Sequence, residues 1–169
     1  MKLKDLLTIV IPCKDENENI KNILSDINNQ NESSGLNVIV ADASEDYTTQ
    51  HYIWSETGKT ANIKVIEGGY PAKARYNGAN LTNTQYILFL DADMRIQNKN
   101  FLLEILNEII EKGSDLLTCK VRTYDKRFNY VYKFFDVVQK LHIITGPFAL
   151  GGIMLFKKTS YDKAGGFNP

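Results

Sequence analysis

Short apolar runs alternate along this chain with longer segments in which apolar residues recur at helical spacing. The runs are typical of strands and lie at residues 6–12, 36–41, 63–66, 86–90, 115–121 and 147–156. The helical patterns lie at residues 20–27, 71–81, 101–110 and 128–144. Strands that alternate with helices form parallel sheets, because each crossover places a helix over one face of the sheet. The pattern therefore predicts an α/β fold of three layers, with a mostly parallel central sheet flanked by helices.

The run Tyr86–Leu90 leads directly into two carboxylates. Its apolar residues do not alternate cleanly with polar ones, which favours a central strand buried on both faces. Asp91 and Asp93 follow at its C-terminal end, where open α/β sheets place their ligands. Once the chain bends, two aspartates at this spacing offer hard oxygen ligands to a divalent cation. The alternative interpretation is a solvated acidic turn after a strand.

A second acidic turn follows the run at residues 36–41. Asp42 is the first residue after this predicted strand, where it is placed to face a ligand. Ser44 and Asp46 are explained equally well as caps of a helix at about residues 47–56, and Asp42 itself has this alternative. The acidic residues before the helix that contains Ile20 have a structural explanation too, because acids at a helix start complement its dipole or cap it. Gly35 is expected to break that helix.

The segment Gly68–Arg75 has the composition of an anion site. A Gly-Gly turn precedes Pro71, which suits the first position of a helix, and Lys73 and Arg75 follow in the first turns. Free backbone N–H groups and the positive end of the helix dipole can hold a phosphate there. Solvated basic residues at a helix start are the alternative interpretation.

Two later segments allow more than one interpretation. The aromatic-rich helix predicted at residues 128–144, with Tyr132, Phe135, Val138 and Leu141 among its apolar positions, either packs over the core and walls an acceptor cleft or touches a membrane interface. The glycine pair at 151–152, inside an apolar run, indicates a bulge or the close approach of a ligand. The helix at residues 101–110 is an ordinary core-facing helix that ends at Gly113.

Composition narrows the class of protein. The 169 residues fit one domain, and twenty basic residues balance twenty acidic ones, so there is no overall charge that would favour nucleic acid. Cys13 and Cys119 lack the spacing of a zinc site or a disulfide framework, which predicts reduced, buried thiols and a cytoplasmic location. No run approaches the ~20 apolar residues that span a membrane.

Five segments, taken in order along the chain, resemble the family-2 glycosyltransferases, which have the Rossmann-like GT-A fold, use nucleotide sugars and mostly invert the anomeric centre. These segments are Val10-Ile11-Pro12 with Glu16 and Ile20, Val40 to Thr48 with Asp42, Ser44, Asp46 and Thr48, Lys73-Ala74-Arg75, Leu90-Asp91-Ala92-Asp93, and Gly165-Gly166-Phe167. The resemblance covers nearly the whole chain, and the order of the segments makes it more specific than any one of them.

The resemblance implies metal-dependent transfer of a hexose from a UDP- or GDP-sugar to a hydroxyl of a glycan or lipid-linked acceptor, with Mn²⁺ or Mg²⁺ as cofactor. It implies that the nucleoside pocket, the diphosphate site and the metal site are built from nine residues. The expected nucleotide-sugar-binding residues are Pro12, Lys14, Glu16, Asp42, Lys73, Arg75, Asp91 and Ala92, and the expected metal ligands are Asp93 and Asp91. No nucleic acid partner is expected, and the parent protein is expected in the cytoplasm, with association at the cytoplasmic face of a membrane left open.

Some positions depart from the family pattern. Tyr76 stands where many members have Asn, Ala41 replaces the first of a frequent acidic pair, and Asp15 stands where Asn is usual. Family members continue past the Gly-Gly-Phe segment to an acidic pair that holds the catalytic base. Residues 1–169 are therefore expected to form a single GT-A domain cut short on its acceptor side, with a nucleotide-binding part at about 1–98, the start of an acceptor part at about 99–169, and the base beyond Pro169.

Two other functions stay open at this stage. Nucleotidyl transfer uses the same kind of cation and phosphate site, but it calls for a glycine-rich, arginine-containing loop after the first strand. The chain has Cys13-Lys14-Asp15-Glu16 there, which is acidic and free of glycine. A non-catalytic module that binds a nucleotide sugar is the second alternative, because the binding residues are present whereas the base is not identified.

Overall fold

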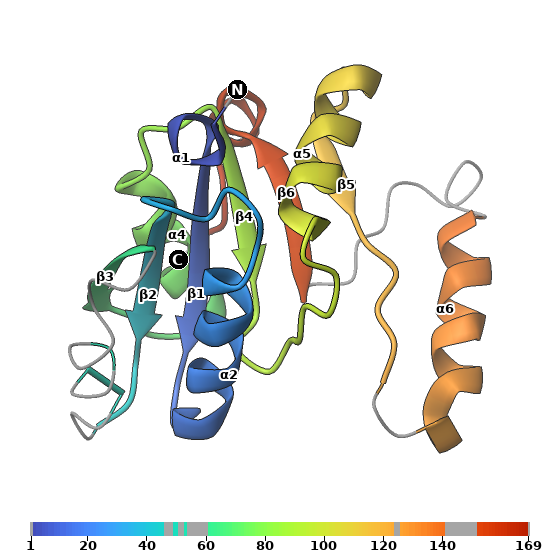
Figure 1. Ribbon diagram of the computed structural model, residues 1–169, viewed down its shortest axis with the longest axis horizontal. Coiled ribbons are helices and arrows are strands. Elements are labelled where there is room, and N and C mark those ends of the chain that lie inside the picture. Colours follow the sequence, from blue (N-terminus) through green and yellow to red (C-terminus); the bar gives the residue numbers. More distant parts are fainter. Residues whose placement is uncertain are drawn as a thin grey trace.

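A six-stranded mixed sheet forms the centre of the computed structural model, which describes residues 2–45, 49–50, 53, 61–123, 126–140 and 152–168. The strands follow the spatial order β3-β2-β1-β4-β6-β5 (Figure 1). Their bounds are β1 (Leu7–Cys13), β2 (Asn37–Asp42), β3 (Asn62–Glu67), β4 (Tyr86–Leu90), β5 (Leu116–Thr118) and β6 (Ile153–Lys157). The first four run parallel, whereas β6 is antiparallel to both β4 and β5. The predicted α/β class with a mostly parallel sheet is confirmed.

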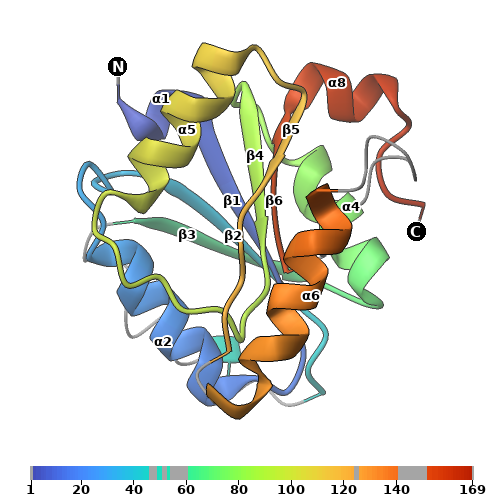
Figure 2. The same ribbon diagram turned by 90° about the vertical axis from the view of Figure 1, so that its right-hand side faces the viewer.

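Helices cover both faces of the sheet (Figures 1 and 2). Residues of α2 (Asn17–Asn28) and α5 (Phe101–Lys112) belong to a core cluster on one face, and residues of α4 (Pro71–Asn80) and α8 (Lys158–Lys163) belong to a second cluster on the other. The predicted stripe of α2 is buried at all four of its apolar positions, Ile20, Ile23, Leu24 and Ile27. Helix α5 ends at Gly113 with φ 60°, as its sequence predicts.

Strand β4 is anchored from both sides. All five of its side chains are buried, with Leu88 in the cluster under α2 and α5 and Phe89 in the cluster under α4 and α8. Full burial of an aliphatic or aromatic side chain contributes roughly 1.5–3 kcal/mol. The turn that begins at Asp91 therefore starts from a strand that packing holds firmly in place.

Helix α2 ends at Asn28, well before Gly35, so the expectation that Gly35 breaks it is wrong. Gln30 is buried just after the end of the helix. Its Nε2 donates to the carbonyl of Asn98 at 2.9 Å, and its Oε1 accepts from the backbone N–H of Leu102 at 3.2 Å. These bonds connect the turn after α2 to the start of α5. The partners lie far apart in sequence, so the pattern of neighbouring residues does not predict the contact.

The edges of the fold differ most from expectation. The strand expected at 115–121 is reduced to Leu116–Thr118, because it lies at the sheet edge and pairs only with β6. A short helix, α1 (Leu3–Leu6), precedes β1 and buries Leu3. The helix expected at about 47–56 and the residues between 141 and 151 lie outside the described residues, apart from Thr49, Gln50 and Ile53.

The helical pattern at 128–144 forms η1 (Lys126–Phe128) and α6 (Asn129–Lys140), and it stands at the outer side of the molecule beyond β5 (Figure 1). Tyr132 and Val138 are half-buried, and among the described residues neither belongs to the two core clusters. Phe135 and Leu141, the other two apolar positions named for this helix, lie outside the described side chains, so its packing over the core stays a prediction, whereas Tyr132 does wall a cavity. Within the described part of the chain, no helix has the length and apolar character needed to cross a membrane.

Candidate functional site

A cavity of about 580 Å³ opens at the carboxyl edge of the parallel strands. Strand β1 contributes Pro12 to it, Ala43 follows β2, Asp91 follows β4, and α4 begins beside it at Pro71. The strand order reverses between β1 and β4, which makes this edge a topological switch point, the usual ligand position in an open α/β sheet. The lining residues are Pro12, Cys13, Lys14, Glu16, Ala43, Gly69, Tyr70, Pro71, Lys73, Arg75, Asp91, Ala92 and Asp93.

Eight of the nine residues predicted for the site line this one cavity. They come from three stretches far apart in sequence: Pro12, Lys14 and Glu16; Lys73 and Arg75; Asp91, Ala92 and Asp93. The ninth, Asp42, is not a lining residue, although its neighbour Ala43 is. The fold therefore gathers the predicted residues, and what each of them binds stays a prediction.

Arg75 and Asp91 form an ion pair inside the cavity. The guanidinium Nη2 of Arg75 donates to Oδ1 of Asp91 at 2.5 Å, and the two side chains are 12% and 31% exposed. Burial raises the pKa of the Asp91 carboxyl, and the charge of Arg75 and its hydrogen bond oppose this rise. The sequence pattern indicated both residues separately but not their pairing, so the diphosphate and metal sites that it predicts are physically linked.

The turn at Asp91-Ala92-Asp93 bends away from the strand. The backbone N–H of Asp91 donates to the carbonyl of Gly152 at 3.0 Å, and that of Met94 donates back to the Asp91 carbonyl at 3.2 Å. A Cβ on Gly152 would lie 2.0 Å from Cε of Met94. The predicted close approach at this glycine is therefore present, but the group that approaches is the Met94 side chain.

Asp42 is buried at the end of β2 and is bonded within its own turn. Its Oδ1 accepts from the backbone N–H and the hydroxyl of Ser44, at 3.1 and 2.7 Å. The Ser44 hydroxyl in turn accepts from the backbone N–H of Asp15 at 2.8 Å, which ties the turn after β2 to the loop after β1. Within the described residues Oδ2 of Asp42 has no hydrogen-bond partner. One oxygen thus shapes the loop, and the other is buried at the end of β2.

Glu16 occupies the N-cap position of α2 without a side-chain capping bond, so the capping interpretation is wrong for this residue. Its carboxylate instead accepts from Nδ2 of Asn19 at 2.5 Å while it lines the cavity. Glu18 lies in the first turn of α2, where the dipole interpretation holds, and its Oε1 lies 2.9 Å from Nζ of Lys21.

The start of α4 has the geometry of an anion site. Pro71 takes the first helical position, and no acidic residue lies in the first turn. Gly68 approaches the end of β2 so closely that a Cβ on it would lie 2.7 Å from the carbonyl oxygen of Ala41. Lys73 is exposed on the first turn and lines the cavity. The helix start thus presents backbone N–H groups and a lysine to the same space.

Two carboxylates of the cavity are candidate metal ligands. Asp91 and Asp93 line the cavity, and the described residues contain no group of three or more His, Cys, Asp or Glu side chains suited to a metal. Mg²⁺ and similar cations are commonly held by one or two carboxylates, with water and substrate phosphate oxygens as the other ligands. The donor set fits a cation that arrives with a phosphate ligand rather than one held by protein alone.

An aromatic cluster packs beside Arg75. The guanidinium carbon of Arg75 lies 5.6 Å from the centroid of the Phe167 ring, and Phe167 packs edge-on against Phe89 at 5.2 Å. The hydroxyl of Tyr161 accepts from the backbone N–H of Phe167 at 3.1 Å. The sequence pattern gave no sign of this contact, although it singled out Gly165-Gly166-Phe167 as a segment of interest.

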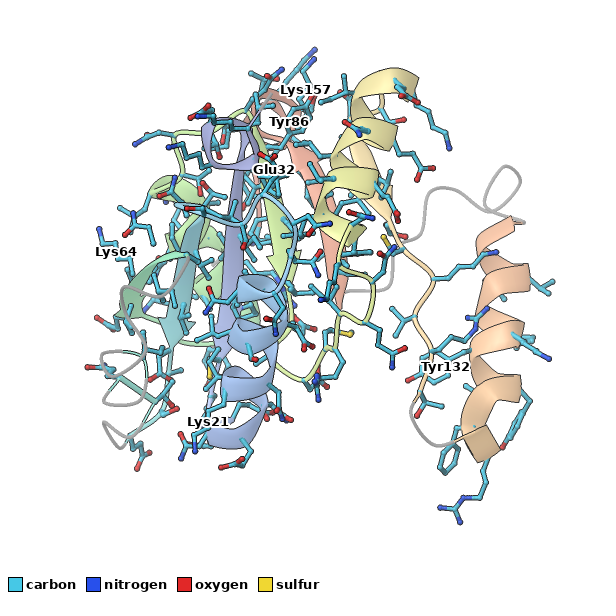
Figure 3. The ribbon with its side chains drawn as sticks, viewed as in Figure 1. Lys21, Glu32, Lys64, Tyr86, Tyr132 and Lys157 are labelled. Carbon is cyan, nitrogen blue, oxygen red and sulfur yellow. The ribbon has the colours of Figure 1, made fainter. Side chains whose placement is uncertain are left out.

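A second cavity, of about 870 Å³, adjoins the first at Asp93, which lines both. Its walls come from the segment after Asp93, from residues 119–123 after β5, and from Tyr132 on α6. Tyr132 projects from the side of α6 that faces the rest of the molecule (Figure 3). Three basic residues line this cavity, Arg95, Lys120 and Arg122, and Asp93 is its one acidic lining residue among the described residues.

The sheet order and the helices on both faces define a doubly wound α/β protein with a cavity at the switch point, where such folds place their ligands. Residues 8–163 match the model of glycosyl transferase family 2, and the chain belongs to that family. No curated protein matches the chain.

Solved structures share the GT-A fold. The mannosyltransferase PcManGT from Pyrobaculum calidifontis, in complex with GDP-Man and Mn²⁺, matches 99% of this chain and 48% of its own at 20% identity, with a TM-score of 0.77. TarS from S. aureus, in complex with UDP-GlcNAc, matches with a TM-score of 0.66 at 18% identity, over 97% of this chain and 48% of its own. Glucosyl-3-phosphoglycerate synthase from Mycobacterium tuberculosis, with Mn²⁺, UDP and phosphoglyceric acid, matches with a TM-score of 0.61 at 18% identity. The match covers 92% of this chain and 56% of the synthase chain. This chain thus spans about half the length of each.

Proposed function

We propose that the chain binds a nucleotide-diphosphate sugar in the first cavity and supplies the donor side of a hexosyltransferase. One observation carries the proposal: a single cavity joins the start of α4, with Lys73 and Arg75, to the carboxylates of Asp91 and Asp93. A diphosphate needs positive charge and N–H donors, and a cation bound to it needs carboxylates, so one ligand class satisfies both sides. Family membership and the GDP- and UDP-containing complexes of the fold neighbours support a UDP- or GDP-sugar as donor.

Different lining residues bind different parts of the donor. Lys73 and the first-turn N–H groups of α4 hold the diphosphate, and Arg75 adds charge while it orients Asp91. Pro12, Lys14 and Glu16 line the part of the cavity beside β1, where the nucleoside lies. The buried Oδ2 of Asp42, behind Ala43, accepts a hydrogen bond from the base or ribose. Ala92 lies between the two aspartates and lines the cavity with them.

Asp93, with Asp91, holds the divalent cation. When it is bound, Mn²⁺ or Mg²⁺ supplies the charge that stabilises the departing diphosphate. Asp93 is exposed, and it is the acidic residue that reaches both cavities. Arg75 meanwhile holds one oxygen of Asp91, which fixes the direction of that carboxylate.

The second cavity receives the acceptor. It meets the first at Asp93, and inversion requires that the acceptor hydroxyl attack the sugar from the side opposite the diphosphate. Inversion also needs a general base to take the hydroxyl proton. Asp115 accepts from Ser160, Asp162 pairs with Lys158, and neither lines a cavity. We therefore place the base outside the described residues, and we propose a donor-binding part at about 1–98 and the start of an acceptor part at about 99–169.

The thiols support a reducing compartment for the protein. Burial raises the pKa of Cys13 to about 12 and that of Cys119 to about 11, and both cysteines are free. Thiols of this kind are stable where disulfides do not form, which supports a cytoplasmic location.

Thermal unfolding with and without Mn²⁺ tests the donor site. A UDP- or GDP-sugar at about 100 times its dissociation constant should add about 2.7 kcal/mol and raise the midpoint by roughly 5–10 °C, and the shift should need the cation. Asp93→Ala should remove the cation-dependent part, whereas Glu111→Ala, an exposed acid on α5, should not. Equal shifts with and without Mn²⁺ would remove the metal from the proposal.

A further inference from the structure

The outer side of η1 and α6 carries a cluster of exposed apolar side chains. Phe128 is 51% exposed, Tyr130 70%, Phe134 65% and Val137 55%. The other large apolar side chains exposed in the described part of the chain are scattered: Tyr70, Leu81, Ile110 and Leu116. Isolated exposed apolar residues are normal, whereas four within ten residues mark a surface that binds something. We call Phe128, Tyr130, Phe134 and Val137 the outer face.

The outer face lies on a different side of α6 from Tyr132, which lines the second cavity. Tyr130, Phe134 and Val137 follow one another at spacings of four and three residues, so they share one side of the helix. Val131, Tyr132 and Val138 are half-buried, and Tyr132 lines the second cavity. Helix α6 therefore carries both half-buried and exposed apolar side chains, and it stands at the rim of the fold (Figure 1).

The charge around the outer face identifies its partner. Residues 126–140, which form η1 and α6, contain four basic residues and one acidic one, a net charge of +3, although the whole chain is neutral. Arg127 and Lys133 are exposed beside the outer face. A surface that combines aromatic side chains with excess positive charge is complementary to a membrane with anionic lipids. A second copy of this chain would instead bring two positive surfaces together.

We propose that the outer face binds the surface of an anionic membrane, with α6 lying parallel to the bilayer plane. Phenylalanine and valine side chains enter the boundary between headgroups and acyl chains, tyrosine stays at headgroup level, and the basic residues meet lipid phosphates. In this orientation the second cavity, which Tyr132 walls from the inner side of α6, stands next to the lipid surface. The proposal does not depend on the donor site, because the outer face lies outside the first cavity.

Vesicle flotation tests it directly. The chain is mixed with vesicles of phosphatidylcholine containing about a third phosphatidylglycerol, or with phosphatidylcholine alone, and the bound fraction is measured at low and high salt. We expect binding to the anionic vesicles that falls at least tenfold at high salt, and little binding to the neutral ones. No binding to anionic vesicles, or equal binding to both, would overturn the proposal.

Matched variants locate the surface. Tyr130→Ser with Phe134→Ser should reduce binding at least tenfold, while Leu81→Ser with Ile110→Ser, which removes two exposed apolar residues elsewhere, should leave it unchanged. Arg127→Gln with Lys133→Gln should reduce binding to anionic vesicles, and Lys99→Gln with Lys163→Gln should not. Circular dichroism checks that each variant is folded. If the control pairs lose as much binding as the outer-face pairs, or if the outer face instead drives self-association in sedimentation, the proposal fails.

Discussion

The guanidinium of Arg75 donates a hydrogen bond to the carboxylate of Asp91 at 2.5 Å, which joins the first turns of α4 to the turn after β4. Both elements line the first cavity. Because both side chains are largely shielded from water, neither charge is well solvated without the other. The pair therefore gives the cavity its shape before any ligand binds.

Arg75→Ala should lower the free energy of unfolding by about 1–3 kcal/mol, because it leaves the Asp91 carboxylate partly buried without its partner. Asp91→Asn in the same chain should recover part of this loss, since the amide carries no charge. Urea unfolding of the wild type, both single variants and the double variant measures the coupling. Strictly additive losses would show that the two residues do not stabilise each other.

Asp42→Ala should weaken nucleotide-sugar binding and lower the stability of the ligand-free protein by no more than about 1 kcal/mol, because one carboxylate oxygen has no partner within the described residues. Ser44→Ala is the matched control, since it removes the hydroxyl bonds of the turn but leaves that oxygen in place. Calorimetric titration and urea unfolding of both variants separate the two effects. A loss of stability without a loss of affinity would make Asp42 purely structural.

The spacing of apolar residues predicted those helices and strands whose buried positions follow a regular period within one segment. The stripe of α2, the five buried residues of β4 and the glycine end of α5 each follow from the sequence of one segment. The position of the candidate site was also predictable from the sequence. Parallel strands place their carboxyl ends at the same edge of the sheet, so residues that follow different strands meet there. Eight predicted residues therefore meet in one cavity although they span residues 12–93.

Contacts between distant side chains could not be predicted in this way. Gln30, just after α2, bonds to Asn98 and Leu102, and Phe167 packs beside Arg75, yet no local sequence pattern links these partners. The second cavity forms between segments that meet only in the fold. Each of these features depends on tertiary packing, which a periodicity of two or 3.6 residues does not encode.

The thiol of Cys13 should make the protein lose stability at alkaline pH. Burial, followed by the negative charge of Asp42, raises the pKa of this thiol from 9.0 to about 12. The unfolded chain therefore releases the proton from about pH 9, whereas the folded chain keeps it until about pH 12. Between these values the free energy of unfolding should fall by up to about 1.4 kcal/mol per pH unit from this group. Cys13→Ala should show a shallower fall between pH 8 and 10.5 in urea unfolding, and an equal slope in both proteins would contradict the prediction.

Phe167→Leu should weaken donor binding more than it weakens the fold. Leucine keeps much of the apolar contact with Phe89 but removes the aromatic face beneath the Arg75 guanidinium, an interaction of roughly 0.5–2 kcal/mol. A guanidinium that is held less firmly positions both Asp91 and the diphosphate less well, so we expect the affinity for a UDP- or GDP-sugar with Mn²⁺ to fall roughly threefold to tenfold. Phe156→Leu is the matched control, because Phe156 packs in the same cluster against Phe89 and Tyr161. Both variants should lose a similar amount of stability, about 1 kcal/mol, and only Phe167→Leu should lose affinity. Equal losses of affinity in the two variants would show that the cluster acts through the stability of the fold and not through Arg75.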